Sequence, residues 1–160
     1  MPTTRRPLLA RSLALGVAGG MRSLTPLAAV VLTHPAAPPG HGWRDWPVLR
    51  HPWGRALVIA MAAAELVGDK LPATPSRLAL PALLGRIGAA ALAGAALGTE
   101  GPRGAAPRAA GLAAVGALLG AMAGYGIRRS LVDASRLPDP AVAVLEDAAA
   151  LALSRAATSG

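Results

Sequence analysis

The residues best suited to chemistry lie at the end of one apolar segment. The apolar run ends with three charged residues, Glu65, Asp69 and Lys70, and Lys70 is the only lysine in the chain. Glu65 and Asp69 are four residues apart, so they share one face of a helix. Because every other basic residue is arginine, the lone lysine indicates that ammonium geometry is wanted at this position. Carboxylates held together in this way favour the binding of a proton or a hard cation.

Further charged residues interrupt other apolar segments. Arg22, followed by Ser23, lies in the first segment, and Glu146 and Asp147 lie in the last. A charge at the centre of a bilayer costs about 2.5 to 3.5 kcal/mol on insertion scales, so we expect these side chains to face the inside of a bundle. We expect Arg22 to pair with one of the carboxylates. The alternative is that the pairs are buried salt bridges that only fix the register of the helices.

A second candidate site is basic. Ser76 and Arg77 precede the third apolar segment, where the free amides at the start of a helix can bind a phosphate. With Lys70 and Arg128, these residues would recognise a lipid phosphate at the membrane surface, in a binding protein or an enzyme. The alternative for Ser76 is an ordinary helix cap.

Other chemistry has little support. The sequence contains no nucleophile elbow, phosphate-binding loop, zinc-protease motif or dinucleotide fingerprint, so we favour a protein without catalytic activity and leave enzymatic activity open. The spacing of His34, His41 and His51 fits no metal motif, and we expect neither a metal nor a cofactor. The net charge of +8 is spread between apolar segments instead of forming a basic face with aromatic residues, which argues against nucleic-acid binding.

Composition indicates a membrane protein. The 160 residues are 53% hydrophobic and contain no phenylalanine, one tyrosine and no cysteine, and the mean hydropathy is +0.46. A soluble core of this size is usually built around aromatic side chains, whereas membrane bundles tolerate small residues because they let helices approach closely. We therefore predict one integral membrane domain over residues 1–160.

The elements that must hold these residues are about five apolar helices, each close to the length that crosses a bilayer. The predicted spans are 13–32, 55–71, 80–98, 109–127 and 140–157. Pro26 predicts a kinked or broken first helix, because it removes a hydrogen bond and frees the carbonyl group of Arg22. Glu146 and Asp147 make the last span the weakest, and it could instead lie on the surface.

The connection between residues 34 and 55 is rich in tryptophan, proline and histidine. Trp43, Trp46 and Trp53 lie there, and tryptophan is enriched at the level of the lipid head groups. We therefore expect this connection to lie at the membrane surface.

Glycines spaced four apart predict where helices touch. Gly116, Gly120 and Gly124 form two such steps, and Gly94 with Gly98 forms another. We expect these seams to pack helices together within the bundle or between the two copies of a homodimer.

The order of charged residues also suggests an internal repeat. Arg22 and Ser23 are echoed by Arg128 and Ser130, and the acidic residues of the second segment are echoed by those of the fifth. An offset of three segments reverses direction across the bilayer, as in inverted-repeat transporters. Connections on the side of the N-terminus, with Arg11 and Arg86 counted as flank charges there, carry more basic residues than the other side, which favours a cytoplasmic N-terminus.

Four stretches carry a resemblance to a known family: Gly20-Met-Arg22-Ser23-Leu-Thr-Pro26, the charged stretch from Glu65 to Arg77, Tyr125-Gly-x-Arg128, and Leu-Glu146-Asp147-Ala. The chain resembles the domain of unknown function 4126 family of bacterial membrane proteins over nearly its whole length. The resemblance implies a small multi-spanning inner-membrane protein without an assigned activity. The short, proline-rich first connection departs from the family and puts helical structure between residues 34 and 55 in doubt.

The sequence as a whole predicts an all-α membrane helix bundle that resembles a transporter. Its expected partners are membrane lipids, a small ion or solute and a second copy of the chain. The expected ligand-binding residues are Arg22, Ser23, Glu65, Asp69, Lys70, Ser76, Arg77, Arg128, Glu146 and Asp147. The lipid-phosphate protein and a non-catalytic membrane scaffold remain the alternatives.

Overall fold

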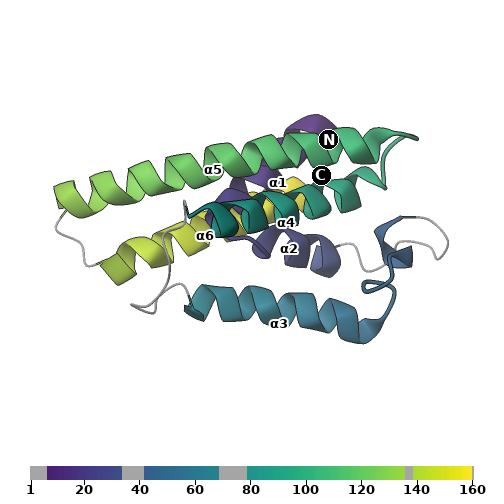
Figure 1. Cartoon of the computed structure of the whole chain (residues 1–160), viewed down its shortest axis with the longest axis horizontal. Helices are drawn as coiled ribbons and strands as arrows, with labels where there is room; N and C mark the ends of the chain where they lie inside the picture. The colour runs from purple at the N-terminus through teal and green to yellow at the C-terminus, as the bar shows by residue number, and fades with distance from the viewer. Residues whose placement is uncertain (1–6, 34–41, 69–78, 136–138, 160) are drawn as a thin grey trace, which may run out of the picture.

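The described part of the chain folds into a bundle of helices (Figure 1). The structure is a computed structural model, and it describes residues 7–33, 42–68, 79–135 and 139–159. These residues form six α-helices, one short 3-10 helix and no strand. The elements are α1 (Leu8–Met21), α2 (Thr25–Thr33), the 3-10 helix η1 (Trp43–Asp45), α3 (Pro52–Gly68), α4 (Leu80–Gly98), α5 (Ala105–Ser135) and α6 (Asp139–Thr158).

The first predicted span is broken into two helices, as Pro26 indicates. The backbone of Arg22 is extended, with φ −141° and ψ 113°, so α1 ends there. Pro26 is the second residue of α2, a position where its missing N–H group removes no helical hydrogen bond. The prediction of a broken first helix is confirmed, and residues Arg22 to Leu24 form the break.

The other four predicted spans each correspond to one helix. α4 begins and ends where the sequence predicts, α3 begins three residues before its predicted start, and α6 extends the last span by one residue at each end. α5 is longer than expected, because the helix continues past Ile127 to Ser135. In the suggested internal repeat, Arg128 corresponds to Arg22, where the first span is broken. α5 is continuous at Arg128, so this feature of the first span is not repeated there.

α1 is the central element of the bundle. It packs against α5, α6 and α4, while α4 also packs against α5, and α2 packs against α6, α4 and α3. α6 is therefore packed into the bundle through α1 and α2. The guanidinium group of Arg11 donates a hydrogen bond of 2.7 Å to the carbonyl oxygen of Ala157, which ties the start of α1 to the end of α6 (Figure 1).

Glycines form the closest contacts between helices. A Cβ atom on Gly16 or Gly20 of α1 would overlap backbone atoms of α5, and one on Gly116 or Gly120 of α5 would overlap backbone atoms of α1. The seam at Gly94 likewise joins α4 to α5. The predicted packing seams therefore join helices inside one chain, whereas Gly124 instead faces the side chain of Glu146.

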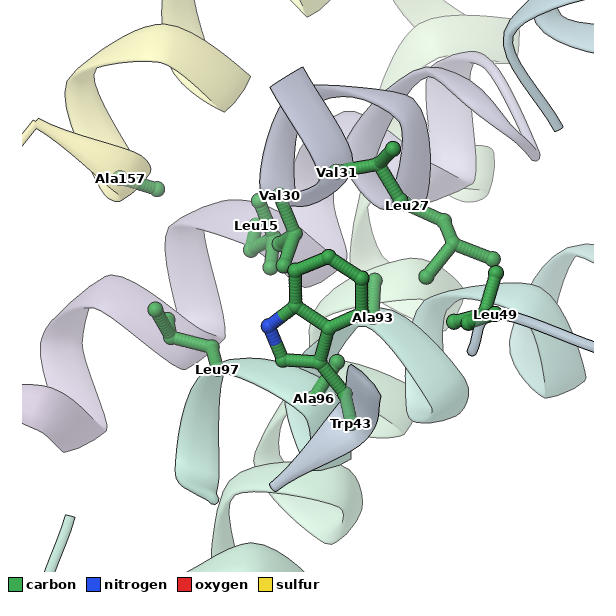
Figure 2. Packing of buried hydrophobic residues seen from close by; sticks show 10 residues of the cluster. All are labelled: Leu15, Leu27, Val30, Val31, Trp43, Leu49, Ala93, Ala96, Leu97 and Ala157. Atoms are coloured by element: carbon green, nitrogen blue, oxygen red, sulfur yellow. The ribbon is translucent and has the colours of Figure 1, made fainter. Parts of the chain in front are cut away.

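The core surrounds one tryptophan from the connection between α2 and α3. Trp43 is fully buried, and its indole ring lies among Leu15, Val30, Ala96 and Leu97 (Figure 2). The sequence predicts that the connection containing Trp43 lies at the level of the head groups. The structure adds that Trp43 belongs to the core, since its side chain packs against α1, α2 and α4.

Two of the described helices are long and apolar enough to cross a membrane. They are Leu80–Gly98 and the segment Ala105–Ile127 of α5. α1 is apolar but shorter. Large apolar side chains on α5 point outward: Leu119 is 52% exposed and Met122 is 59% exposed.

Candidate functional site at the helix break

The break between α1 and α2 frees backbone groups that other helices bind. The carboxylate of Glu65 accepts hydrogen bonds from the backbone amides of Ser23, at 2.7 Å, and Leu24, at 2.9 Å. Leu24 also provides the carbonyl group that accepts the first helical hydrogen bond of α2, from Ala28. A negative charge is favourable here because the start of a helix carries free N–H groups and a partial positive charge. Glu65 therefore anchors α3 to the start of α2.

An arginine binds the opposite side of the break. Nη1 of Arg86, on α4, donates hydrogen bonds to the carbonyl oxygens of Met21, at 2.9 Å, and Gly20, at 3.3 Å. These carbonyl groups are in the last turn of α1, where the helix carries a partial negative charge. Nη1 of Arg86 is also 3.9 Å from Oε1 of Glu65. The same guanidinium group thus connects the end of α1 with the carboxylate that holds the start of α2.

A second ion pair joins the break to α6. Nε of Arg22 donates a hydrogen bond of 2.5 Å to Oδ1 of Asp147, and Nη2 is 2.5 Å from the same oxygen. Arg22 is fully buried and Asp147 is 8% exposed. The prediction that Arg22 pairs with a carboxylate is confirmed. Burying either charge without its partner would cost on the order of several kcal/mol, because the ion loses its hydration. Arg22 and Asp147 therefore depend on each other.

Glu146 lies beside this pair and borders a small cavity. It is 9% exposed and lines a cavity of about 170 Å³ together with Met21 of α1 and Gly124 of α5. The other lining residues that the structure describes are aliphatic. This cavity has room for a few water molecules or a small solute next to a carboxylate.

The structure brings together half of the predicted site residues. Arg22, Ser23, Glu65, Glu146 and Asp147 all lie at or beside the helix break. Asp69, Lys70, Ser76 and Arg77 lie outside the described residues, and the side chain of Arg128 is also outside them.

The sequence interpretation missed Arg86. It counted Arg11 and Arg86 as charges at the membrane flanks, but these residues are 9% and 5% exposed and both bind carbonyl groups inside the bundle. An available signal was that Arg86 lies within the predicted span 80–98, where a charge needs a partner just as Arg22 does. Both residues are corrections to the predicted flank charges.

The arrangement is that of a broken helix with charged side chains at both new ends. In transporters with discontinuous helices, the free amides at such a break bind anionic groups of the substrate, and the free carbonyl groups bind cations. Here a carboxylate occupies the first position and a guanidinium group the second. An incoming anion would compete with Glu65, and an incoming cation would compete with Arg86.

The comparison with protein families agrees with the sequence motifs at this break. The family described as Domain of unknown function (DUF4126) matches residues 9–159. The chain belongs to the DUF4126 family. No curated protein and no solved structure matches it. In this DUF4126 protein, the Arg22 motif and the Glu146-Asp147 motif meet through the pair described above, while Glu65 of the central motif binds the two amides beside Arg22. Three separate motifs of the sequence thus contribute to one site.

Proposed function

We propose that this protein is a transporter-like membrane protein that binds a small ion or solute at the break between α1 and α2. The apolar composition and the two helices that are long enough to cross a bilayer support the membrane assignment. In this proposal α1 and α2 together form one discontinuous span, and α3, α4, α5 and α6 form the others.

One observation carries the proposal: side chains from three other helices bind the broken helix. Glu65 comes from α3, Arg86 from α4 and Asp147 from α6. A membrane protein gains nothing from three charged helices around a break if a continuous apolar helix would do, because each charge is costly to bury. Binding a polar ligand at the freed amides and carbonyl groups gives this arrangement a use.

The ligand would replace internal contacts and not fill a preformed polar cavity. Glu65 and Arg86 occupy the backbone groups that a ligand needs, so binding requires one of them to move aside. Protonation of Glu65, or neutralisation by a cation, would weaken its bonds to the amides of Ser23 and Leu24, because charged hydrogen bonds are the stronger ones. This exchange would couple a proton or cation to a second ligand.

The cellular setting follows from the same proposal. We place the protein in the inner membrane of a bacterium, with the N-terminus in the cytoplasm. Five spans of small residues enclose little volume, so a homodimer that shares one path suits a solute larger than an ion. With Arg11 and Arg86 buried, the orientation depends on the charges at the remaining flanks.

Flux measurement in proteoliposomes tests the assignment. The wild-type protein, Glu65→Gln and Asp147→Asn would be reconstituted at equal density, and proton and monovalent cation flux recorded with trapped fluorescent dyes. Glu100→Gln is the matched control, because Glu100 is an exposed residue in the connection between α4 and α5. We expect Glu65→Gln and Asp147→Asn to lower flux at least tenfold and Glu100→Gln to leave it unchanged.

A membrane scaffold is the second candidate, and a specific observation favours it. Glu65, Arg86, Arg22 and Asp147 all have partners inside the bundle, as expected for charges that only fix helix register. The scaffold predicts that Glu65→Gln and Asp147→Asn lower thermal stability in detergent while the wild-type protein shows no flux above empty liposomes. That result would reject the transporter assignment.

A further inference from the structure

A second cavity lies away from the charged cluster, between α2, α3 and α6. Its volume is about 440 Å³, which is within the range of roughly 300 to 1,000 Å³ that small-molecule sites occupy. Leu32 of α2, Ile59 and Ala63 of α3, and Leu151 of α6 contribute to an aliphatic wall. The wall is suited to an alkyl chain, and the volume allows one such chain and not the two chains of a phospholipid.

Two buried hydroxyl groups belong to the lining. Thr25 is 4% exposed and Ser154 is 1% exposed, and both residues line the cavity. Among the described residues, neither Oγ1 of Thr25 nor Oγ of Ser154 has a hydrogen-bond partner. A buried hydroxyl group without a partner costs about 1 to 3 kcal/mol, so a ligand oxygen that accepts from these groups would remove that cost.

The charge at the cavity is positive. Arg155 follows Ser154 and is one of the lining residues, and it is exposed in the last turn of α6. None of the described residues that line the cavity is acidic. An aliphatic wall, hydroxyl donors and one guanidinium group together match a molecule with a single alkyl chain and an anionic oxygen head.

We infer that this cavity binds a fatty acid, with the chain between α2, α3 and α6 and the carboxylate at Ser154 and Arg155. The carboxylate accepts hydrogen bonds from the hydroxyl group and pairs with the guanidinium group. Exposed apolar residues of α2 and α3, such as Leu32 at 60% and Met61 at 49% exposure, would let the chain enter from surrounding lipid. This site shares no residue with the charged cluster at the helix break.

Binding of palmitate to the purified full-length protein in detergent micelles tests the inference. The affinity would be measured by isothermal titration and the stoichiometry by native mass spectrometry. We expect saturable binding of one palmitate per chain. Ala63→Trp should weaken it at least tenfold, because Ala63 is an exposed residue of the cavity wall. Ala64→Trp is the matched control, since Ala64 is exposed on the same helix outside the lining.

The head group is tested separately. Arg155→Gln should weaken palmitate binding about tenfold and leave 1-hexadecanol binding unchanged, whereas Arg108→Gln, at an exposed arginine of α5, should change neither. Ser154→Ala removes only one oxygen and should not disturb folding. It therefore keeps the inference testable if circular dichroism shows that Ala63→Trp does not fold. We expect Ser154→Ala to weaken palmitate binding about threefold to tenfold.

Three results would overturn the inference. The first is palmitate uptake that does not saturate, or uptake that is the same in the wild-type protein, Ala63→Trp and Ser154→Ala. Either outcome would mean that palmitate only partitions into the micelle. The second is equal affinity for palmitate and 1-hexadecanol, which removes the role of Arg155. The third is tighter binding of phosphatidylglycerol than of palmitate, which means a two-chain lipid site. None of these results depends on flux at the helix break, so the two proposals can fail separately.

Discussion

Arg22 and Asp147 form a buried ion pair although 125 positions separate them in the sequence. Removal of one partner leaves the other buried without its counter-charge. We therefore expect Arg22→Met to lower the free energy of unfolding by about 3 to 5 kcal/mol. The double variant Arg22→Met/Asp147→Leu should recover most of the loss, because no buried charge remains. Thermal and denaturant unfolding in detergent measure both, and equal losses in the single and double variants would contradict the pairing.

The contact of Glu65 with the amides of Ser23 and Leu24 predicts the local stability of α3. α3 packs chiefly on α2, so this carboxylate provides much of its attachment. We expect Glu65→Ala to cost about 0.5 to 2 kcal/mol, as for the loss of a helix cap. Hydrogen exchange of the amides of α3 should become faster, while that of α5 stays unchanged. Unchanged exchange in α3 would show that α2 alone holds this helix.

A glycine-to-alanine substitution should have opposite effects inside and outside the glycine seam between α1 and α5. Gly20→Ala places a methyl group into backbone atoms of Ala117 and Ala121, which should destabilise by about 1 to 3 kcal/mol. The Cβ atom of Gly111→Ala would meet no atom within 4 Å. This substitution should stabilise the protein by about 0.5 to 1 kcal/mol, because alanine loses less backbone conformational entropy than glycine when the helix forms. Unfolding midpoints of the two variants should therefore move in opposite directions.

The membrane assignment is testable because the chain has no cysteine. Leu119→Cys places a thiol on the exposed apolar side of α5, and Arg103→Cys places one in the exposed connection before α5. In broken membranes, a membrane-impermeant maleimide should label only the thiol at position 103. Both thiols should react after solubilisation in sodium dodecyl sulfate. Labelling at position 119 in intact lipid would place that side of α5 in water.

Local chemistry predicted the elements and the break, but not most of the contacts. Pro26 is enough to predict that the first span divides, and the apolar run from Leu80 to Gly98 is enough to predict α4. The sequence also indicated that Arg22 needs a carboxylate. It did not identify Asp147 over Glu65, because both lie on helices whose rotation depends on the packing of the whole bundle.

Trp43 and Arg86 show why the remaining contacts were not predictable. A tryptophan among prolines and histidines fits a membrane surface and a core equally well by composition, and only the space between α1, α2 and α4 places it inside (Figure 2). Arg86 was interpreted from its closeness to the start of a span. Its actual partners are carbonyl groups of Gly20 and Met21, and backbone acceptors leave no trace in the amino-acid pattern.

The interlocked glycines of α1 and α5 also determine which parts of the molecule can shift. Gly16, Gly20, Gly116 and Gly120 bring two backbones into direct contact, so neither helix can slide or rotate past the other without a collision of main-chain atoms. In the proposed transport cycle, α1 and α5 would therefore stay fixed relative to each other. The movement would then fall mainly to α3, which packs chiefly on α2 and is tied to the helix break by the carboxylate of Glu65.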